Sequence, residues 1–146
     1  MTAKALIAGG LAASVTVTAV HQILKAITSK SPRMDLLGME VLDKGYEKAG
    51  ADKPSYDTRY WMTMAGDIVS NAAYYSLAGA GGKKGLFAKG GLLGALAGIG
   101  ALVLPKPMGL NPAHSNRTKT TKLLSVGLYL LGGLVSSAVT KAVAKR

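Results

Sequence analysis

The chain has 146 residues, of which 49% are hydrophobic and 17% charged, with a net charge of +11 and a mean hydropathy of +0.26. Soluble domains carry about 25% charged residues, so this composition argues against a soluble domain and indicates an integral membrane protein. The sequence has no cysteine, which excludes disulfide, thiol and zinc–thiolate chemistry, and we expect no metal and no cofactor.

Four stretches carry no charge, at residues 5–22, 68–82, 90–105 and 123–140. They predict four membrane spans, at residues 4–27, 60–79, 86–104 and 122–143. Each has about the 20 residues that cross a bilayer as a helix. The first resembles a signal peptide in its small apolar residues, but we expect it to be retained as a span. Pro105 ends the third, because proline cannot extend a helix. The sequence therefore predicts an all-α fold, a four-helix membrane bundle formed by residues 1–146 as a single domain.

The connection between the first two spans predicts an amphipathic helix over 32–49, lying at the membrane surface or over the mouth of the bundle. A solvated connecting helix is the alternative. Ser31 suits its N-cap and Gly50 its end. Its acidic residues have lysines one turn away, which favours surface ion pairs over a metal site. The apolar face comprises Met34, Leu37, Val41 and Leu42, and the acidic cluster comprises Glu40, Asp43 and Glu47.

Small residues recur at a spacing of four in every predicted span. Gly90, Gly94 and Gly98 form such a ridge in the third span. Because lipid supplies little hydrophobic drive between helices, close backbone contact through small residues is what supports their association. We expect helix packing here, and this ridge is the strongest candidate for an outer seam that would serve a homo-oligomer or a larger membrane complex.

One acidic residue, Asp67, falls inside a predicted span, while the other acidic residues lie between 35 and 57. Six residues of helix place it about 9 Å below the membrane surface near Trp61. His21 lies six residues before the end of the first span near Ile27, and so about 9 Å deep on the neighbouring helix. We therefore expect His21 to be the partner of Asp67.

The residues around this pair extend it into a polar cluster. In one interpretation the cluster is structural and fixes which helices face each other. In the other it binds a cation, a proton or a small polar ligand, because ionisable groups within spans are costly and usually mark a site. The predicted cluster consists of Asp67, Asn71, Tyr74, His21, Gln22 and Lys25, to which Ser125 and Tyr129 of the last span are possible additions.

The connection before the last span holds His114, Arg117 and Lys119, which we expect to contact lipid headgroups or to form an ordinary polar loop. The bilayer is the expected partner of the excess basic residues, and nucleic acid is not, because these residues flank apolar segments. The two longer connections carry eleven of the 18 Lys and Arg residues, which weakly favours their lying in the cytoplasm.

Three functions are compatible with these features. The first is a membrane protein that handles a ligand or ion at Asp67. The second is a non-catalytic accessory or assembly subunit that docks through its small-residue ridges. The third and least favoured is a membrane enzyme acting on a lipid headgroup through His114 and Arg117, since the spans contain no HExxH, GxSxG or paired-carboxylate motif.

Overall fold

The computed structural model describes residues 1–145, and these residues form helices and no strand. Four long helices, α1 (Ala3–Ile27), α3 (Tyr56–Ser76), α4 (Leu86–Val103) and α6 (Lys119–Val143), make the bundle. The shorter elements are α2 (Met34–Ala49), α5 (Ala113–Asn116) and the 3₁₀ turn η1 (Leu77–Gly79). Three of the long helices, α1, α4 and α6, are long and apolar enough to cross a membrane. The fourth, α3, is as long as a span but more polar.

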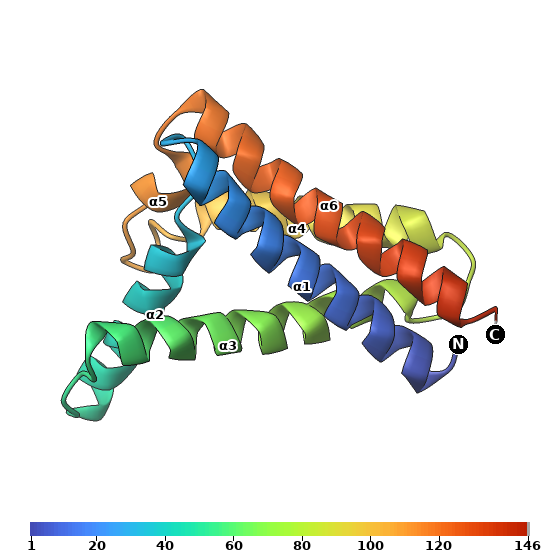
Figure 1. The fold of residues 1–146 in the computed structure, drawn as a ribbon, viewed down its shortest axis with the longest axis horizontal. Coiled ribbons are helices and arrows are strands. Elements are labelled where there is room, and N and C mark those ends of the chain that lie inside the picture. Colours follow the sequence, from blue (N-terminus) through green and yellow to red (C-terminus); the bar gives the residue numbers. More distant parts are fainter. Residues whose placement is uncertain (146) are drawn as a thin grey trace.

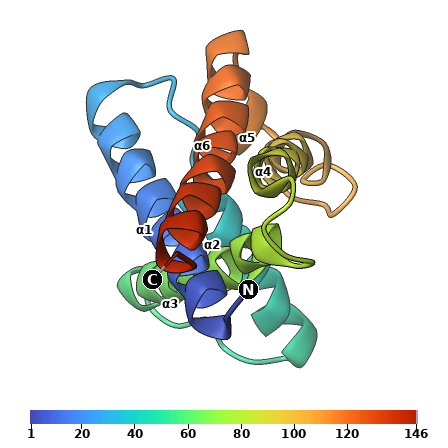
Figure 2. The same cartoon turned by 90° about the vertical axis from the view of Figure 1, so that its right-hand side faces the viewer.

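The bundle has two unlike ends (Figure 1). Both termini and the turn between η1 and α4 lie at one end, which we call the terminal end. Helices α2 and α5 lie at the opposite end, the loop end. Helix α6 packs against both α1 and α4, whereas α3 packs mainly against α1. Figure 2, turned by a right angle, shows α4 beside α6 and α3 beneath α1.

The α4–α6 interface is built on glycine. A Cβ atom on Gly94 would lie 2.6 Å from the Tyr129 carbonyl oxygen, and one on Gly98 would lie 2.7 Å from the Val126 Cα. Such distances are too short for real side chains, so the two backbones approach as closely as they do because Cβ atoms are absent. Gly90 is buried against α6 in the same way. This ridge is therefore not the free outer seam that the sequence suggested for self-association.

Helix α1 fits between α6 and α3 through adjacent small residues. Gly9 faces the α6 backbone, where a Cβ atom would lie 2.8 Å from the Ser136 carbonyl oxygen, and Gly10 faces Ala72 of α3. Buried hydroxyls then cross between helices. Ser14 donates to the Ile68 carbonyl (2.8 Å) and Ser136 donates to the Tyr75 carbonyl (2.8 Å).

Helix α2 begins later than expected. Its N-cap position is Arg33, which makes no side-chain cap, and Ser31 instead donates its hydroxyl to the Pro32 carbonyl at 3.1 Å. The predicted Ser31 cap is wrong because the Arg33 backbone N–H donates to the His114 carbonyl (2.7 Å), which holds the chain out of the helix up to that residue. Gly50 ends α2 in the left-handed conformation, with φ of 64°.

The glycine interface predicts a sharp difference between two neighbouring positions. Gly94→Leu should destabilise the bundle by about 1–3 kcal/mol, the usual cost of overpacking, because a side chain there collides with α6. Gly91→Leu is the matched control, since nothing lies within 4 Å of a Cβ atom at Gly91. Thermal unfolding in detergent micelles measures both. Equal unfolding temperatures for the two variants would contradict the packing described here.

Candidate functional site

The acidic residues of α2 connect it to the elements around it. Glu40 accepts from His114 Nε2 (2.9 Å) and from the Asn111 backbone N–H (2.8 Å) in the connection between α4 and α6. Asp43 pairs with Arg59 of α3 at 2.6 Å. Glu47, the third member of the acidic cluster, pairs at 2.6 Å with Lys53 in the exposed loop that follows α2. Glu40 and Asp43 thus have their partners beyond α2, and only Glu47 forms a local surface ion pair. The bonds of Glu40 and Asp43 hold α2 across the loop end of the bundle.

Asp35 makes the densest of these connections. It is 1% exposed, and its carboxylate accepts from Lys25 Nζ of α1 (2.8 Å) and from Arg33 Nε and Nη2 (3.0 and 2.9 Å). Its side chain also lies 3.9 Å from His21 Nε2, which donates to the Pro32 carbonyl at 3.0 Å. Two cations and the imidazole therefore gather around one carboxylate.

The chemistry at Asp35 strongly favours its charged form. Burial of the carboxyl opposes ionisation, but the hydrogen bonds from Arg33 and Lys25 outweigh burial and hold the pKa of Asp35 well below its usual range. The same interaction raises the pKa of Arg33. The group is therefore an anchor between α1 and α2 that is charged at neutral pH.

This anchor changes the expected pairing of Asp67. His21 and Lys25 were expected beside Asp67, but both face Asp35 instead. Within residues 1–145 the Asp67 carboxylate takes part in no hydrogen bond or ion pair. The Ser70 hydroxyl donates to the backbone carbonyl of Asp67 and not to its carboxylate. His21 and Asp67 do line a common small cavity of about 20 Å³, which is room for about one water molecule.

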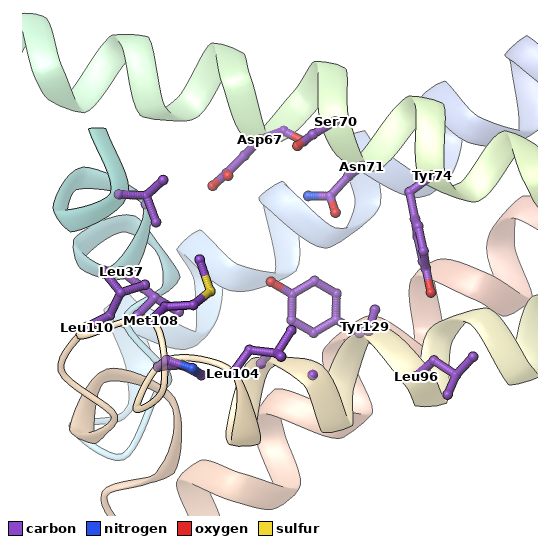
Figure 3. Close-up of a pocket in the computed structure, with 16 residues that line it drawn as sticks. Leu37, Asp67, Ser70, Asn71, Tyr74, Leu96, Leu104, Met108, Leu110 and Tyr129 are labelled. Carbon is purple, nitrogen blue, oxygen red and sulfur yellow. The ribbon is translucent and has the colours of Figure 1, made fainter. Parts of the chain in front are cut away.

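Asp67 opens instead onto a much larger pocket, of about 580 Å³, between α3 and α4. The close-up in Figure 3 shows Asp67 and Asn71 pointing from α3 into this space, with the ring of Tyr129 from α6 below them. At one end of the pocket the Tyr74 hydroxyl donates to the Leu93 carbonyl (2.8 Å) and joins α3 to α4. At the other end lies α2, where a side chain at Gly38 would meet Thr63 and Asp67 of α3.

The two walls of this pocket, which we call the α3–α4 pocket, differ in polarity (Figure 3). The α3 wall is polar, with a carboxylate, an amide and two hydroxyl groups from Asp67, Asn71, Ser70 and Tyr74. The facing wall is apolar. It is formed by α4 and the connection that follows it, through Leu96, Ala97, Ala101, Leu104, Met108 and Leu110.

The other predicted site residues lie elsewhere. Gln22 bridges α1 and α3, with Nε2 donating to the Tyr60 hydroxyl at 3.2 Å. His114 is occupied by Glu40, and Arg117 donates to the Ser29 carbonyl, so both are used in holding the loop end together. Lys119 lies exposed at the start of α6. Of the predicted cluster, Asp67, Asn71 and Tyr74 share the α3–α4 pocket, whereas His21, Gln22 and Lys25 do not.

Sequence reasoning missed Asp35 and the apolar wall of the pocket. Asp35 lies two residues from Arg33 in a connection rich in charges, and nothing in its spacing indicates that the chain folds it back onto Lys25. Its position in the first turn of α2 beside a basic residue was the available signal. Comparison of the chain with protein-family models, with curated proteins and with solved structures finds no match.

The Asp35 anchor predicts a stability loss that depends on pH. Asp35→Asn should destabilise the protein by about 2 kcal/mol near neutral pH, because it leaves Lys25 and Arg33 without their shared anion. The native pKa is depressed, so this stabilisation is present above about pH 4, the unfolded value, and is lost as pH falls further toward the native value.

Thermal unfolding in detergent at several pH values measures this loss. Asp52→Asn, which removes the same charge from an exposed loop position, is the matched control and should change little. The difference in unfolding free energy between wild type and Asp35→Asn should be smaller at pH 3 than at pH 7. An equal difference at the two pH values would contradict the anchor.

Proposed function

We propose that the chain is a small polytopic membrane protein whose α3–α4 pocket, centred on Asp67, binds or passes a cation, a proton or a small polar ligand. The observation that carries this proposal is a carboxylate without an ion-pair partner among residues 1–145, facing a pocket of about 580 Å³. Ionisable groups in this setting are costly, and a ligand is what offsets the cost.

The direction of the chain supports a fourth span. Helices α1 and α4 both run from the terminal end to the loop end (Figure 1). A chain that crosses a membrane twice in the same direction must return in between, and α3 is the segment that returns. We therefore propose α3 as a span with Asp67 inside it, and α2 as an amphipathic surface helix across the mouth of the bundle.

The anchor at Asp35 favours a site over structural glue. If Asp67 fixed the helix pairing, its carboxylate would be expected to hold His21 or Lys25. Both groups are held by Asp35 instead. Helix pairing in this region already rests on other bonds, such as that from Ser14 to the Ile68 carbonyl, so the charge of Asp67 is free for a ligand.

An accessory subunit is the alternative proposal. The glycine ridge that was predicted to dock a partner is not available for it. The ridge of Gly90, Gly94 and Gly98 is buried against α6, and Gly9 and Gly10 are buried against α6 and α3. A partner would have to dock on larger side chains that face outward, such as Val69 and Leu123. Surrounding lipid satisfies these side chains equally well.

Asp67→Asn tests the site directly. The substitution keeps the shape of the side chain and removes an unpaired, desolvated charge, so the unfolding temperature should stay the same or rise. The probes are Na⁺, K⁺ and methylammonium. We expect at least one of them to stabilise wild type and Asp52→Asn, by about 2.7 kcal/mol at one hundred times its Kd. The same probe should not stabilise Asp67→Asn. Thermal unfolding in lipid nanodiscs measures both effects.

The opposite pattern would refute the site. A variant that loses stability, together with a wild type that responds to none of the probes, identifies Asp67 as internal glue.

Topology labelling tests the fourth span. The chain has no cysteine, so single cysteines introduced at Ala51 and Ala80, both exposed and on either side of α3, report without background. If α3 crosses the membrane, a membrane-impermeant maleimide should label one position in intact vesicles and the other only after permeabilisation. Labelling of both positions from the same side would contradict a spanning α3.

A further inference from the structure

We propose that the ligand of the α3–α4 pocket is an amphiphilic organic amine, with a positively charged ammonium head at Asp67 and an apolar body along α4, and that it enters from the bilayer between α3 and α4. This inference rests on the proposed function and narrows it to one class of ligand.

The charge of the pocket selects a cation. Asp67 is the acidic residue among the lining residues, and none of them is Lys, Arg or His. Lys25 and Arg33 are bound to Asp35 and do not line this pocket. His21 shares only the separate small cavity with Asp67, and its Nε2 is bound to the Pro32 carbonyl. A positively charged ligand is therefore the complement of this pocket.

The donor set argues against a multiply coordinated metal ion. Within residues 1–145 no group of three or more His, Cys, Asp or Glu residues could hold a metal. Calcium takes about six to eight oxygen ligands, several of them usually carboxylates, and one carboxylate with one amide falls well short. An ammonium group has three N–H donors. The Asp67 carboxylate, the Asn71 carbonyl and the Tyr129 hydroxyl oxygen are three acceptors that line the same pocket.

The size of the pocket indicates a ligand with an apolar part in addition to its cationic head. A water molecule takes about 30 Å³ of liquid volume, so a bare monovalent ion at Asp67 would fill a small part of about 580 Å³. Pockets of about 300–1,000 Å³ hold organic ligands. Since the wall opposite Asp67 is made of apolar side chains, the part of the ligand that fills this volume must be apolar.

The apolar wall continues to the outside of the bundle. Leu96, Leu104 and Met108 line the pocket and are also 54%, 53% and 53% exposed. In a membrane Leu96, within α4, faces hydrocarbon, whereas Leu104 and Met108 lie at the end of α4 and just beyond it. The contact between Tyr74 and Leu93 closes the pocket toward the terminal end, and α2 covers the loop end. An amphiphile dissolved in the bilayer can therefore move sideways along this wall until its head reaches Asp67.

The test compares three probes that separate the head from the body: decylammonium has both, methylammonium has the head alone, and decanol has the body alone. The protein is placed in phosphatidylcholine nanodiscs with its methionine methyl groups labelled with carbon-13, and the Met108 signal is assigned with Met108→Leu. Titration of this signal gives an apparent affinity for each probe. Comparison with Asp67→Asn removes the contribution of simple partitioning into lipid.

We expect decylammonium to bind wild type and Asp52→Asn at least tenfold more tightly than Asp67→Asn, since a hydrogen bond to a charged group is worth about tenfold or more in affinity. Decanol should not distinguish these proteins. Ala97→Phe, which fills the apolar part of the pocket and keeps Asp67, should weaken decylammonium severalfold and leave methylammonium unchanged. Ala101→Phe replaces it if Ala97→Phe does not fold.

The outcomes separate the two proposals. If methylammonium binds as tightly as decylammonium and the phenylalanine variants change nothing, the amphiphile is wrong while the cation site at Asp67 stands. If decanol binds as well as decylammonium, the cationic head plays no part and the inference is overturned. If no probe, Na⁺ and K⁺ included, depends on Asp67, the proposed function fails together with it.

Discussion

The arrangement of this molecule depends on the capture of two basic side chains by Asp35. Lys25 comes from the end of α1 and Arg33 from the connection that follows it, and both bind the same buried carboxylate. This interaction places the start of α2 against α1. It also pairs Lys25, which the sequence placed beside Asp67, with a different carboxylate. Because Asp35 binds these bases, the Asp67 carboxylate has no basic partner among residues 1–145.

The packing of the helices then places the α3–α4 pocket beside Asp67. Helix α6 holds α1 and α4 closely because Gly9, Gly94 and Gly98 bring no side chains to the contacts. Helix α3 belongs to the α1 side of the bundle and reaches α4 at the bond between Tyr74 and Leu93. Between that bond and α2 the two helices stand apart, and the pocket forms there with a polar and an apolar wall.

The sequence predicted the helical class and the shared face of Asp67, Asn71 and Tyr74, since both follow from local rules. Uncharged stretches of sufficient length indicate membrane helices, and helical spacing puts Asp67, Asn71 and Tyr74 on one face. It could not predict the partner of His21 and Lys25. Helix counting placed His21 level with Asp67, and the two residues do line one small cavity, but which carboxylate the bases of α1 meet depends on how the connection before α2 folds back. The apolar wall depends on how α3 and α4 diverge, which no local pattern encodes.

The central claim, that Asp35 and not Asp67 holds the bases of α1, can be measured directly. Solid-state NMR of the protein in lipid bilayers, with nitrogen-15 in lysine side chains and carbon-13 in Asp carboxyl groups, detects which carboxylate lies within contact of the Lys25 Nζ; Asp35→Asn and Asp67→Asn assign the signals. We predict a strong coupling from Lys25 to Asp35, lost only in Asp35→Asn. A coupling from Lys25 to Asp67 in the wild-type protein would contradict this account.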